Sequence, residues 1–218
     1  MFPLKDNIPS KTFPFITYLI VFLNVLLFIH ELTLAAGLDA LIGQYALTPA
    51  NINFNNFDTL YPFVTSAFLH GGWLHILGNM WFLIVFGDNV EDKFGHIKFL
   101  LFYLAAAFVA AFAQYAAGPT SATPIIGASG AVAGVLGSYI LLFPRSKILT
   151  LVFIIIFVTL LEIPAYLVLG FWFILQLLNG IYSLDTTITG SLIAYWAHIA
   201  GFLFGLVISV YYKAISKN

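Results

Sequence analysis

The sequence predicts an all-α polytopic membrane protein, because its composition and its long apolar runs both argue against a water-soluble fold. Of the 218 residues, 61% are hydrophobic and only 8% are charged, whereas soluble domains carry about 25% charged residues. Several apolar runs are long enough to cross the hydrocarbon core of a bilayer as helices. The formal net charge of −1 gives no indication of a nucleic-acid partner.

Seven apolar stretches are candidate membrane spans. The first covers residues 13–29 and could be mistaken for a secretory signal. We interpret it as a retained span, because it is longer than a signal core of about 7–15 residues and no clean cleavage site follows it. The other six stretches are 73–86, 97–117, 129–143, 148–163, 164–181 and 192–212.

The eight basic residues predict the orientation of these stretches. They form four clusters, which the positive-inside rule assigns to the cytoplasmic side. The clusters are Lys5/Lys11, Lys93/Lys98, Arg145/Lys147 and Lys213/Lys217. The connections 31–72, 118–128 and 182–191 contain no Lys or Arg and are expected outside.

Parity then requires that one of the three stretches between the last two clusters does not span. We expect this to be 148–163, lying along or dipping into the cytoplasmic face, because Glu162 beside Pro164 is poorly placed at mid-bilayer. A continuous helix of 34 residues is the alternative; at about 51 Å it would need extreme tilt. Six spans result, with both termini inside.

The aromatic-rich loop 31–72 is expected to lie in the membrane interface.

Three polar side chains, those of Ser129, His198 and Asn79, are expected to share one depth in the membrane. His75 and Asn79 are four residues apart and lie on one helical face. Ser129, His198 and Asn79 precede the next cytoplasmic basic cluster by 16, 15 and 14 residues. At the helical rise these counts correspond to about 24, 22 and 21 Å, several ångströms below the outer boundary.

Small residues recur on the helices that carry Ser129 and His198. Faces of this kind let membrane helices approach backbone to backbone, so these two spans are expected to be neighbours. The residues concerned are Gly127, Gly130, Gly134 and Gly137 on one stretch and Ala194, Ala197, Gly201 and Gly205 on the other.

These residue types fit an acyl-transfer site. Such a site needs a nucleophile, here a serine, a general base, here a histidine, and oxyanion donors, here an asparagine and free N–H groups at a helix N-terminus. A lone membrane serine is usually a packing residue, but the shared depth favours chemistry. Glu162, the only acid within an apolar run, is expected near the cytoplasmic side, so Ser129 and His198 would act as a dyad. The absence of cysteine excludes thiolate nucleophiles and disulfides.

We expect no metal and no cofactor. The zinc-protease motif H-E-x-x-H is absent, because Ile76 follows His75. A site built from His70, His75 and His198 would lack a carboxylate. An aspartyl protease would need two membrane aspartates, and Asp88 is expected at a helix end.

Three motifs together resemble those of the rhomboid intramembrane serine proteases. They are Gly127-Ala128-Ser129-Gly130, Ala197-His198-Ile199-Ala200-Gly201 with Gly205, and the segment from His70 to Asn79. The resemblance covers about residues 14–213 in the order typical of the family, so residues 1–218 are expected to form a single rhomboid-type membrane domain.

The resemblance implies a six-transmembrane-helix rhomboid-like bundle with a membrane-lying loop between helices 1 and 2. It implies that Ser129 is the nucleophile and His198 the general base, and that His75, Asn79 and the Ser129 backbone N–H form the oxyanion hole. The fifth span, 164–181, would lie where the family admits substrates laterally. The implied partners are the lipid bilayer and single-pass transmembrane proteins, cut in or near the outer part of their membrane segment.

Two departures from the family pattern bear on the site. Many members carry a Trp-Arg pair in the first loop, where this chain has Leu60-Tyr61-Pro62-Phe63. Some members stack a tyrosine on the histidine from four residues after the nucleophile, and Ala133 occupies that position here. The ring of His198 must therefore be oriented by other groups, for which Tyr195 and Trp196 are candidates.

Two other functions fit parts of the sequence. A non-proteolytic rhomboid-like protein that escorts membrane clients would have no need of both dyad residues. A small-molecule channel or transporter would need charged pathway residues, which the spans lack.

The compact core, with no transit-type N-terminus, favours a prokaryotic plasma membrane, with the site opening to the outer side.

Overall fold

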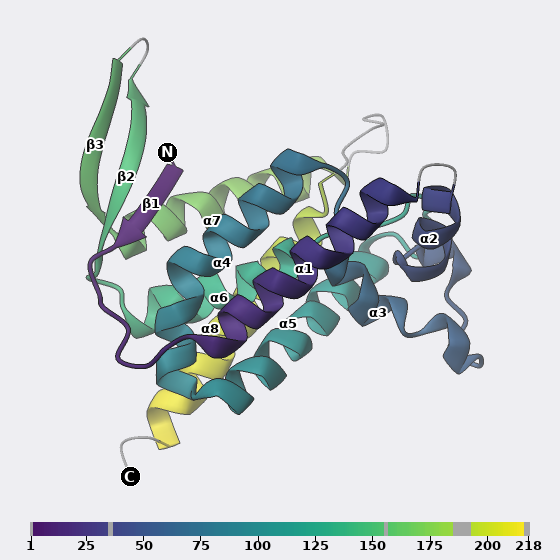
Figure 1. Cartoon of the computed structure of the whole chain (residues 1–218), viewed down its shortest axis with the longest axis horizontal. Helices are drawn as coiled ribbons and strands as arrows, with labels where there is room; N and C mark the ends of the chain where they lie inside the picture. The colour runs from purple at the N-terminus through teal and green to yellow at the C-terminus, as the bar shows by residue number, and fades with distance from the viewer. Residues whose placement is uncertain (1, 35–36, 155–156, 185–192, 216–218) are drawn as a thin grey trace.

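The computed structural model describes residues 2–34, 37–154, 157–184 and 193–215, and most of them are helical (Figure 1). Six helices form the body of the molecule. They are α1 (Phe15–Thr33), α4 (Trp73–Phe94), α5 (His96–Ala117), α6 (Ser129–Leu142), α7 (Ala165–Tyr182) and α8 (Tyr195–Ile215).

Four of these helices, α1, α5, α7 and α8, are each long and apolar enough to cross a membrane. A fifth candidate is the bent pair formed by residues 57–68 and α4, whose two parts meet at 81°. The chain is therefore an integral membrane protein. The apolar helix α6 has only 14 residues, which span about 21 Å against a hydrocarbon core of about 30 Å.

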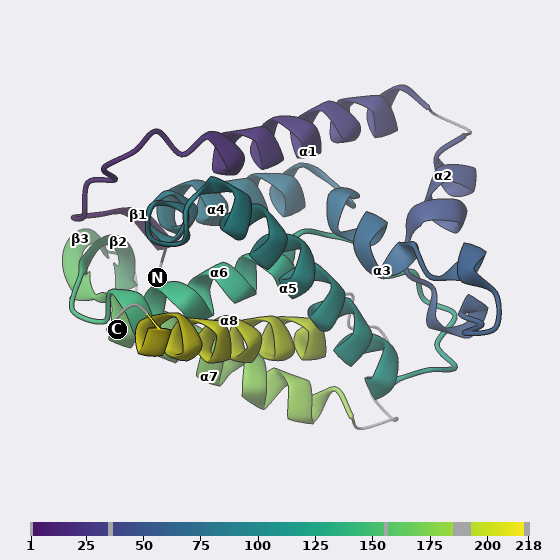
Figure 2. The same ribbon diagram turned by 90° about the horizontal axis from the view of Figure 1, so that it is seen from below.

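The short helix α6 lies at the centre of the bundle, packed against α4, α5 and α8 (Figures 1 and 2). Its residues from Gly130 to Tyr139 are all buried. At its N-terminal end, Ala128 and Gly130 are buried and Ser129 between them is partly buried. The helix therefore begins within the bundle.

Glycines determine how closely α6 and α8 approach each other. A methyl group built on Gly201 would overlap the carbonyl oxygen of Gly130, and one on Gly205 would overlap that of Gly134. The same pair of helices is joined by Ser138, whose hydroxyl donates to the Gly205 carbonyl at 3.1 Å. The two spans that the glycine pattern predicts to be neighbours are in backbone contact.

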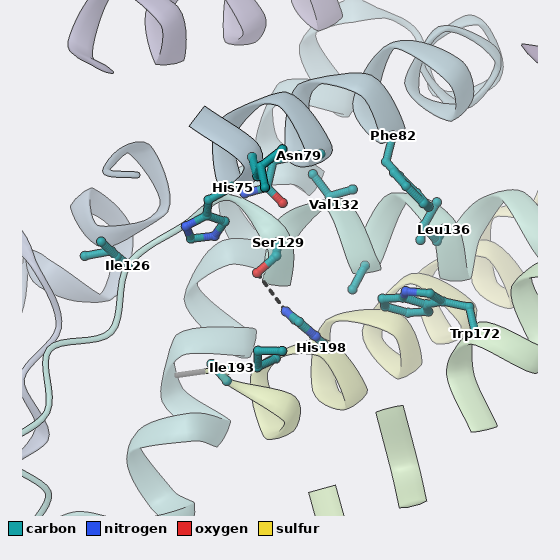
Figure 3. A pocket seen from close by; sticks show the side chains of 14 residues that line it. His75, Asn79, Phe82, Ile126, Ser129, Val132, Leu136, Trp172, Ile193 and His198 are labelled. Carbon is teal, nitrogen blue, oxygen red and sulfur yellow. Dashed lines mark hydrogen bonds between the residues drawn. The ribbon is translucent and has the colours of Figure 1, made fainter. Parts of the chain in front are cut away.

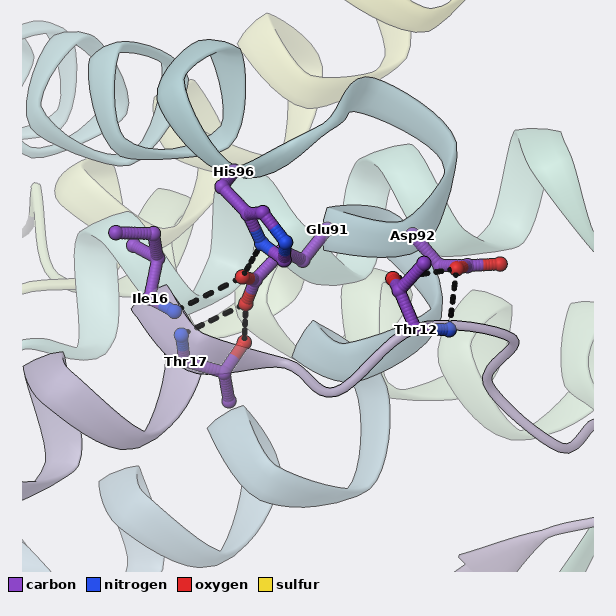
Figure 4. A network of polar contacts seen from close by, with 6 residues as sticks. All are labelled: Thr12, Ile16, Thr17, Glu91, Asp92 and His96. Atoms are coloured by element: carbon purple, nitrogen blue, oxygen red, sulfur yellow. Dashed lines mark hydrogen bonds and ion pairs between the residues drawn. The ribbon is translucent and has the colours of Figure 1, made fainter.

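The helix α1 is held to α4 by the buried carboxylate of Glu91 (Figure 4). It accepts hydrogen bonds from the backbone N–H of Ile16 at 2.8 Å and from the N–H and hydroxyl of Thr17, both at 2.7 Å. These N–H groups lie in the first turn of α1, where a helix has no internal acceptors. His96 Nδ1 lies 2.5 Å from the same carboxylate.

The connection between α1 and α4 is folded, not extended. It comprises α2 (Leu38–Tyr45), the 3₁₀ turns Pro49–Asn51, Phe57–Thr59 and Ser66–Phe68, and α3 (Pro62–Thr65). Phe63 is 1% exposed and packs against Phe108, Phe112 and Tyr115 of α5. The expected position of this loop in the membrane interface stays a prediction.

The expectation of an all-α fold is wrong in one part, because three strands form an antiparallel sheet in the order β1-β2-β3. They are β1 (Phe2–Asp6), β2 (Lys147–Ile154) and β3 (Phe157–Pro164). Residues 148–161 are rich in β-branched and aromatic side chains, which favour strands. A short, continuously apolar run does not reveal by its periodicity whether it is strand or helix.

The end of the hairpin lies where the sequence predicts a break. Pro164 precedes the first turn of α7, and Glu162 pairs with Lys147 across the hairpin at 3.1 Å. The alternative of one continuous helix over 148–181 is therefore excluded. In Figure 1 the hairpin projects away from the helical body, at the end of the bundle where β1 also lies.

Candidate active site

Ser129 and His198 face each other across the contact between α6 and α8. Ser129 is the first residue of α6, and His198 lies in the first turn of α8. His198 Nε2 lies 2.7 Å from Ser129 Oγ. The dashed line in Figure 3 marks this hydrogen bond. His198 is buried, with 9% of its surface exposed. The depth count from the sequence thus identifies two side chains that are in hydrogen-bond contact.

The backbone before Ser129 has a conformation that a side chain would hinder. Gly127 has φ +117° and donates its N–H to the Ser66 carbonyl at 2.9 Å. A methyl group on Gly127 would also overlap the ring of His75. Gly127 was predicted as a packing residue between the two glycine-rich helices, but its close neighbour is this histidine of α4.

His75 and Asn79 lie one turn apart on α4 and line the same cavity as Ser129 and His198 (Figure 3). The N–H groups of the first turn of α6, including that of Ser129, have no acceptor within their own helix. The cavity is therefore lined by the Ser129 hydroxyl, two imidazoles, the Asn79 carboxamide and free N–H donors. Such a set can attack a carbonyl and bind the oxyanion that forms.

The cavity at this site has a volume of about 430 Å³ and is mostly apolar. Its apolar wall includes Phe82, Val132, Leu136 and Trp172. A second cavity of about 490 Å³ adjoins it, and the two share His75, Ile126, Ile193 and Ala194. The second cavity adds polar groups from Gln114, Ser121, Thr123 and Ser183. Water in this second, more polar cavity would therefore reach the edge of the first one.

The side chains that contact His198 differ in part from those expected. Its Nδ1 lies 2.8 Å from Gln176 Oε1, and the Trp172 ring lies 5.9 Å away at 33°, both from α7. Of the two candidates, Tyr195 meets the ring edge-on at 6.5 Å. Trp196 instead lines the second cavity.

The sequence analysis does not predict Gln176 and Trp172, because a third catalytic group is ordinarily an acid and the spans offer none beside His198. A usable signal was present, since Gln176 is one of two carboxamides in a largely apolar span and lies four residues after Trp172, so that the two share a helical face.

A second group missed by the sequence analysis lies behind Asn79. Asn79 Nδ2 is 3.1 Å from His70 Nε2. The backbone N–H of His70 lies 3.3 Å from both carboxylate oxygens of Glu31, at the end of α1. The sequence motif from His70 to Asn79 includes this histidine without a role, and in the structure its ring contacts the predicted oxyanion-hole carboxamide.

Together, the fold and the site define an integral membrane protein with a serine–histidine pair that lines a cavity within the helical bundle. The chain matches the family model described as Rhomboid domain over residues 58–215, most of its length. It therefore belongs to the rhomboid family.

Three curated relatives illustrate the similarity. The chain is 28% identical to rhomboid protease GlpG of Haemophilus influenzae over 160 residues, which cover 73% of each protein. It is 38% identical over 81 residues to Rhomboid-like protein 11, chloroplastic, of Arabidopsis thaliana, covering 37% of this chain and 29% of that protein. It is 31% identical over 176 residues to RHOMBOID-like protein 12, mitochondrial, of the same plant, covering 72% of this chain and 48% of that protein. The chain thus spans less than half the length of these two plant relatives.

Proposed function

We propose that this rhomboid-family protein is a serine-type intramembrane endopeptidase. The observation that carries the proposal is the 2.7 Å contact between Ser129 Oγ and His198 Nε2 beside a cavity in the membrane domain. A serine that serves only packing has no need of an imidazole acceptor, whereas a nucleophilic serine does. The name of the Haemophilus relative, rhomboid protease, agrees with this reading.

The first half of the reaction forms an acyl-enzyme. Ser129 Oγ attacks the carbonyl carbon of the scissile bond while its proton passes to His198 Nε2. The tetrahedral intermediate collapses, the C–N bond breaks, and His198 returns the proton to the leaving amine. The products are a free amino terminus and an ester on Ser129.

The second half hydrolyses the ester. A water molecule attacks the acyl carbon while His198 Nε2 accepts one of its protons. The C–O bond to Ser129 then breaks, the proton returns to Ser129 Oγ, and a carboxylic acid leaves. The polar cavity that shares His75 with the apolar one would supply this water.

The charge that develops on the carbonyl oxygen in both halves needs donors. We assign His75, the Asn79 carboxamide and the Ser129 N–H to this role. Donors already fixed in place stabilise such an oxyanion without having to reorganise during the reaction. In an apolar cavity their effect is larger than in water.

Single-pass transmembrane proteins are the proposed substrates, cut in or near the outer part of their membrane segment. An intact helix keeps its carbonyls hydrogen-bonded, so the segment must be extended at the scissile bond. The proposal includes six spans, α1 and α4 to α8, with the loop between α1 and α4 in the interface. Both termini would be cytoplasmic, and the site would open to the outer side of a prokaryotic plasma membrane.

Cleavage in proteoliposomes tests the proposal. Purified protein is reconstituted with a model single-pass substrate, and its Ser129→Ala variant is compared with Ser138→Ala, which alters a serine of the same helix that bonds the Gly205 carbonyl. We expect cleavage to fall to background in the first variant and to persist in the second. Equal cleavage by Ser129→Ala and the wild type would refute the assignment. Folded wild type that binds but never cleaves a panel of such substrates would favour a non-proteolytic client-binding protein.

A further inference from the structure

We propose that Gln176 is a positioning residue that holds His198 in the tautomer with its proton on Nδ1, so that Nε2 can accept the Ser129 proton. The inference deepens the proposed function and rests on it. The side-chain amide of Gln176 on α7 would thus contact His198 Nδ1, a position that an acidic residue occupies in a catalytic triad.

The hydrogen-bond chemistry of the ring carries the argument. A neutral imidazole has one N–H donor and one acceptor nitrogen. Gln176 Oε1, 2.8 Å from Nδ1, can only accept, so the proton belongs on Nδ1. Nε2 is then the acceptor, and it lies 2.7 Å from Ser129 Oγ. The two contacts are satisfied together only by this tautomer.

The opposite amide orientation would be unproductive. If the Gln176 NH₂ group faced His198, it would donate to Nδ1 and the ring proton would lie on Nε2, pointing at Ser129. Nε2 could not then accept the serine proton. The orientation of one amide therefore decides whether the pair can react.

A second contact from the same helical face holds the ring from the side. Trp172 lies one turn before Gln176, and its ring is 5.9 Å from that of His198. Ala133, which lines the same cavity, has no ring to stack on the histidine. Thus α7 provides both an anchor for Nδ1 and a neighbour for the imidazole ring.

The other carboxamide of α7 shows that the contact is not a general property of this helix. Asn179 Nδ2 donates to the Leu175 carbonyl of its own helix at 2.8 Å, and its side chain is exposed. It is satisfied locally, as polar side chains on membrane helices often are. Gln176 instead reaches α8, and it is only partly exposed.

Kinetics in proteoliposomes give the first test. Gln176→Met keeps the length of the side chain and removes its acceptor, whereas Gln176→Glu restores an acceptor oxygen; Asn179→Ala is the matched control. We expect Gln176→Met to lower kcat about tenfold with KM nearly unchanged, Gln176→Glu to recover most of kcat, and Asn179→Ala to match the wild type. Wild-type kcat in Gln176→Met, or a loss of kcat that Gln176→Glu does not relieve, would overturn the inference.

The tautomer itself gives a test that does not require activity. In nitrogen-15 NMR of histidine-labelled protein, with His198→Ala used for assignment, the wild-type ring should carry its proton on Nδ1. Gln176→Met should give a mixture of tautomers. A wild-type ring protonated on Nε2 would overturn the inference even in an active protease. An Nδ1-protonated ring in a protein that cleaves nothing would instead contradict the proposed function and leave the positioning by Gln176 standing.

Discussion

At the scale of single residues, Asn79 is held by a polar contact that reaches back to α1. Its carboxamide nitrogen lies 3.1 Å from His70 Nε2, and the His70 N–H lies 3.3 Å from the oxygens of buried Glu31. Polar groups buried in a membrane domain are costly unless they are paired. This chain of contacts therefore fixes Asn79 at the cavity wall.

Asn79→Ala should lower kcat by about 10²–10³ with a smaller effect on KM, because the lost donor acts mainly in the transition state. Steady-state cleavage of a reconstituted substrate measures both constants. Asn89→Ala, on the same helix but outside the cavity, is the comparison. A loss confined to KM would place Asn79 in ground-state binding instead.

The sequence was sufficient to predict that Ser129 and His198 meet, because residue counts convert into depth at a constant helical rise and the small-residue faces indicate that their helices are neighbours. It did not identify Gln176, because depth says nothing about which way a helical face is turned. The rotation of α7 depends on its packing against α8, and that packing is a property of the folded molecule. The contact between His70 and Asn79 depends likewise on how the chain bends before α4.

At the scale of elements, the contact between α6 and α8 is what brings the two reactive side chains together. Gly201 and Gly205 lie against the carbonyls of Gly130 and Gly134. In a membrane, where the hydrophobic effect does not drive helices together, such close packing supplies much of their attraction. The site therefore depends on glycines that take no part in its chemistry.

Gly205→Ala should lower the free energy of unfolding by about 1–3 kcal/mol, because the added methyl group would overlap the Gly134 carbonyl. Gly170→Ala is the matched control, since a methyl group there meets no atom within 4 Å. Unfolding of both variants in detergent measures the difference. Equal stabilities for the two variants would contradict the proposed packing.

A similar comparison tests the junction of α1 and α4. Glu91→Ala removes the acceptor for two backbone N–H groups in the first turn of α1, and should cost about 3 kcal/mol of unfolding free energy. Glu162→Ala removes an exposed ion pair with Lys147 and should cost under about 1 kcal/mol. Thermal unfolding of the two variants in one detergent measures the contrast, and a larger loss for Glu162→Ala would contradict it.

Among the secondary-structure elements, the helices could be predicted from the sequence, but the hairpin of β2 and β3 could not. Helix positions followed from apolar runs bounded by charges, and the observed helices differ from the predicted ones mainly at their ends, as α4 does by extending to Phe94. The run 148–163 was separated from the spans by its Glu162 and Pro164. The strand β2 pairs with β3 in the hairpin and also with β1, more than 140 residues away, and this second pairing cannot be read from the local sequence.

At the scale of the whole molecule, Lys93 and Lys213 lie at the same end of the bundle. Lys213 Nζ donates to the Leu141 carbonyl at 2.6 Å, and Lys93 Nζ lies 5.7 Å from the centre of the Phe143 ring. These contacts bring the ends of α4, α6 and α8 together beside the sheet, while α2 and α3 lie at the opposite end (Figure 2). The arrangement agrees with the positive-inside assignment, which stays a prediction.

Cysteine accessibility tests that orientation directly, because the chain has no native cysteine. Asn55→Cys and Arg145→Cys place single thiols at exposed positions in the loop between α1 and α4 and before β2. In intact cells, a membrane-impermeant maleimide should label the first at once and the second only after permeabilisation. The reverse pattern would invert the proposed topology.

The central claim is that Ser129 and His198 react as a pair within the membrane domain, and covalent labelling tests it most directly. Purified protein is treated with a fluorophosphonate, and the modified residue is located by mass spectrometry. The account predicts modification at Ser129 in the wild type and its loss in His198→Ala. Folded wild type that stays unmodified, or equal modification in His198→Ala, would contradict it.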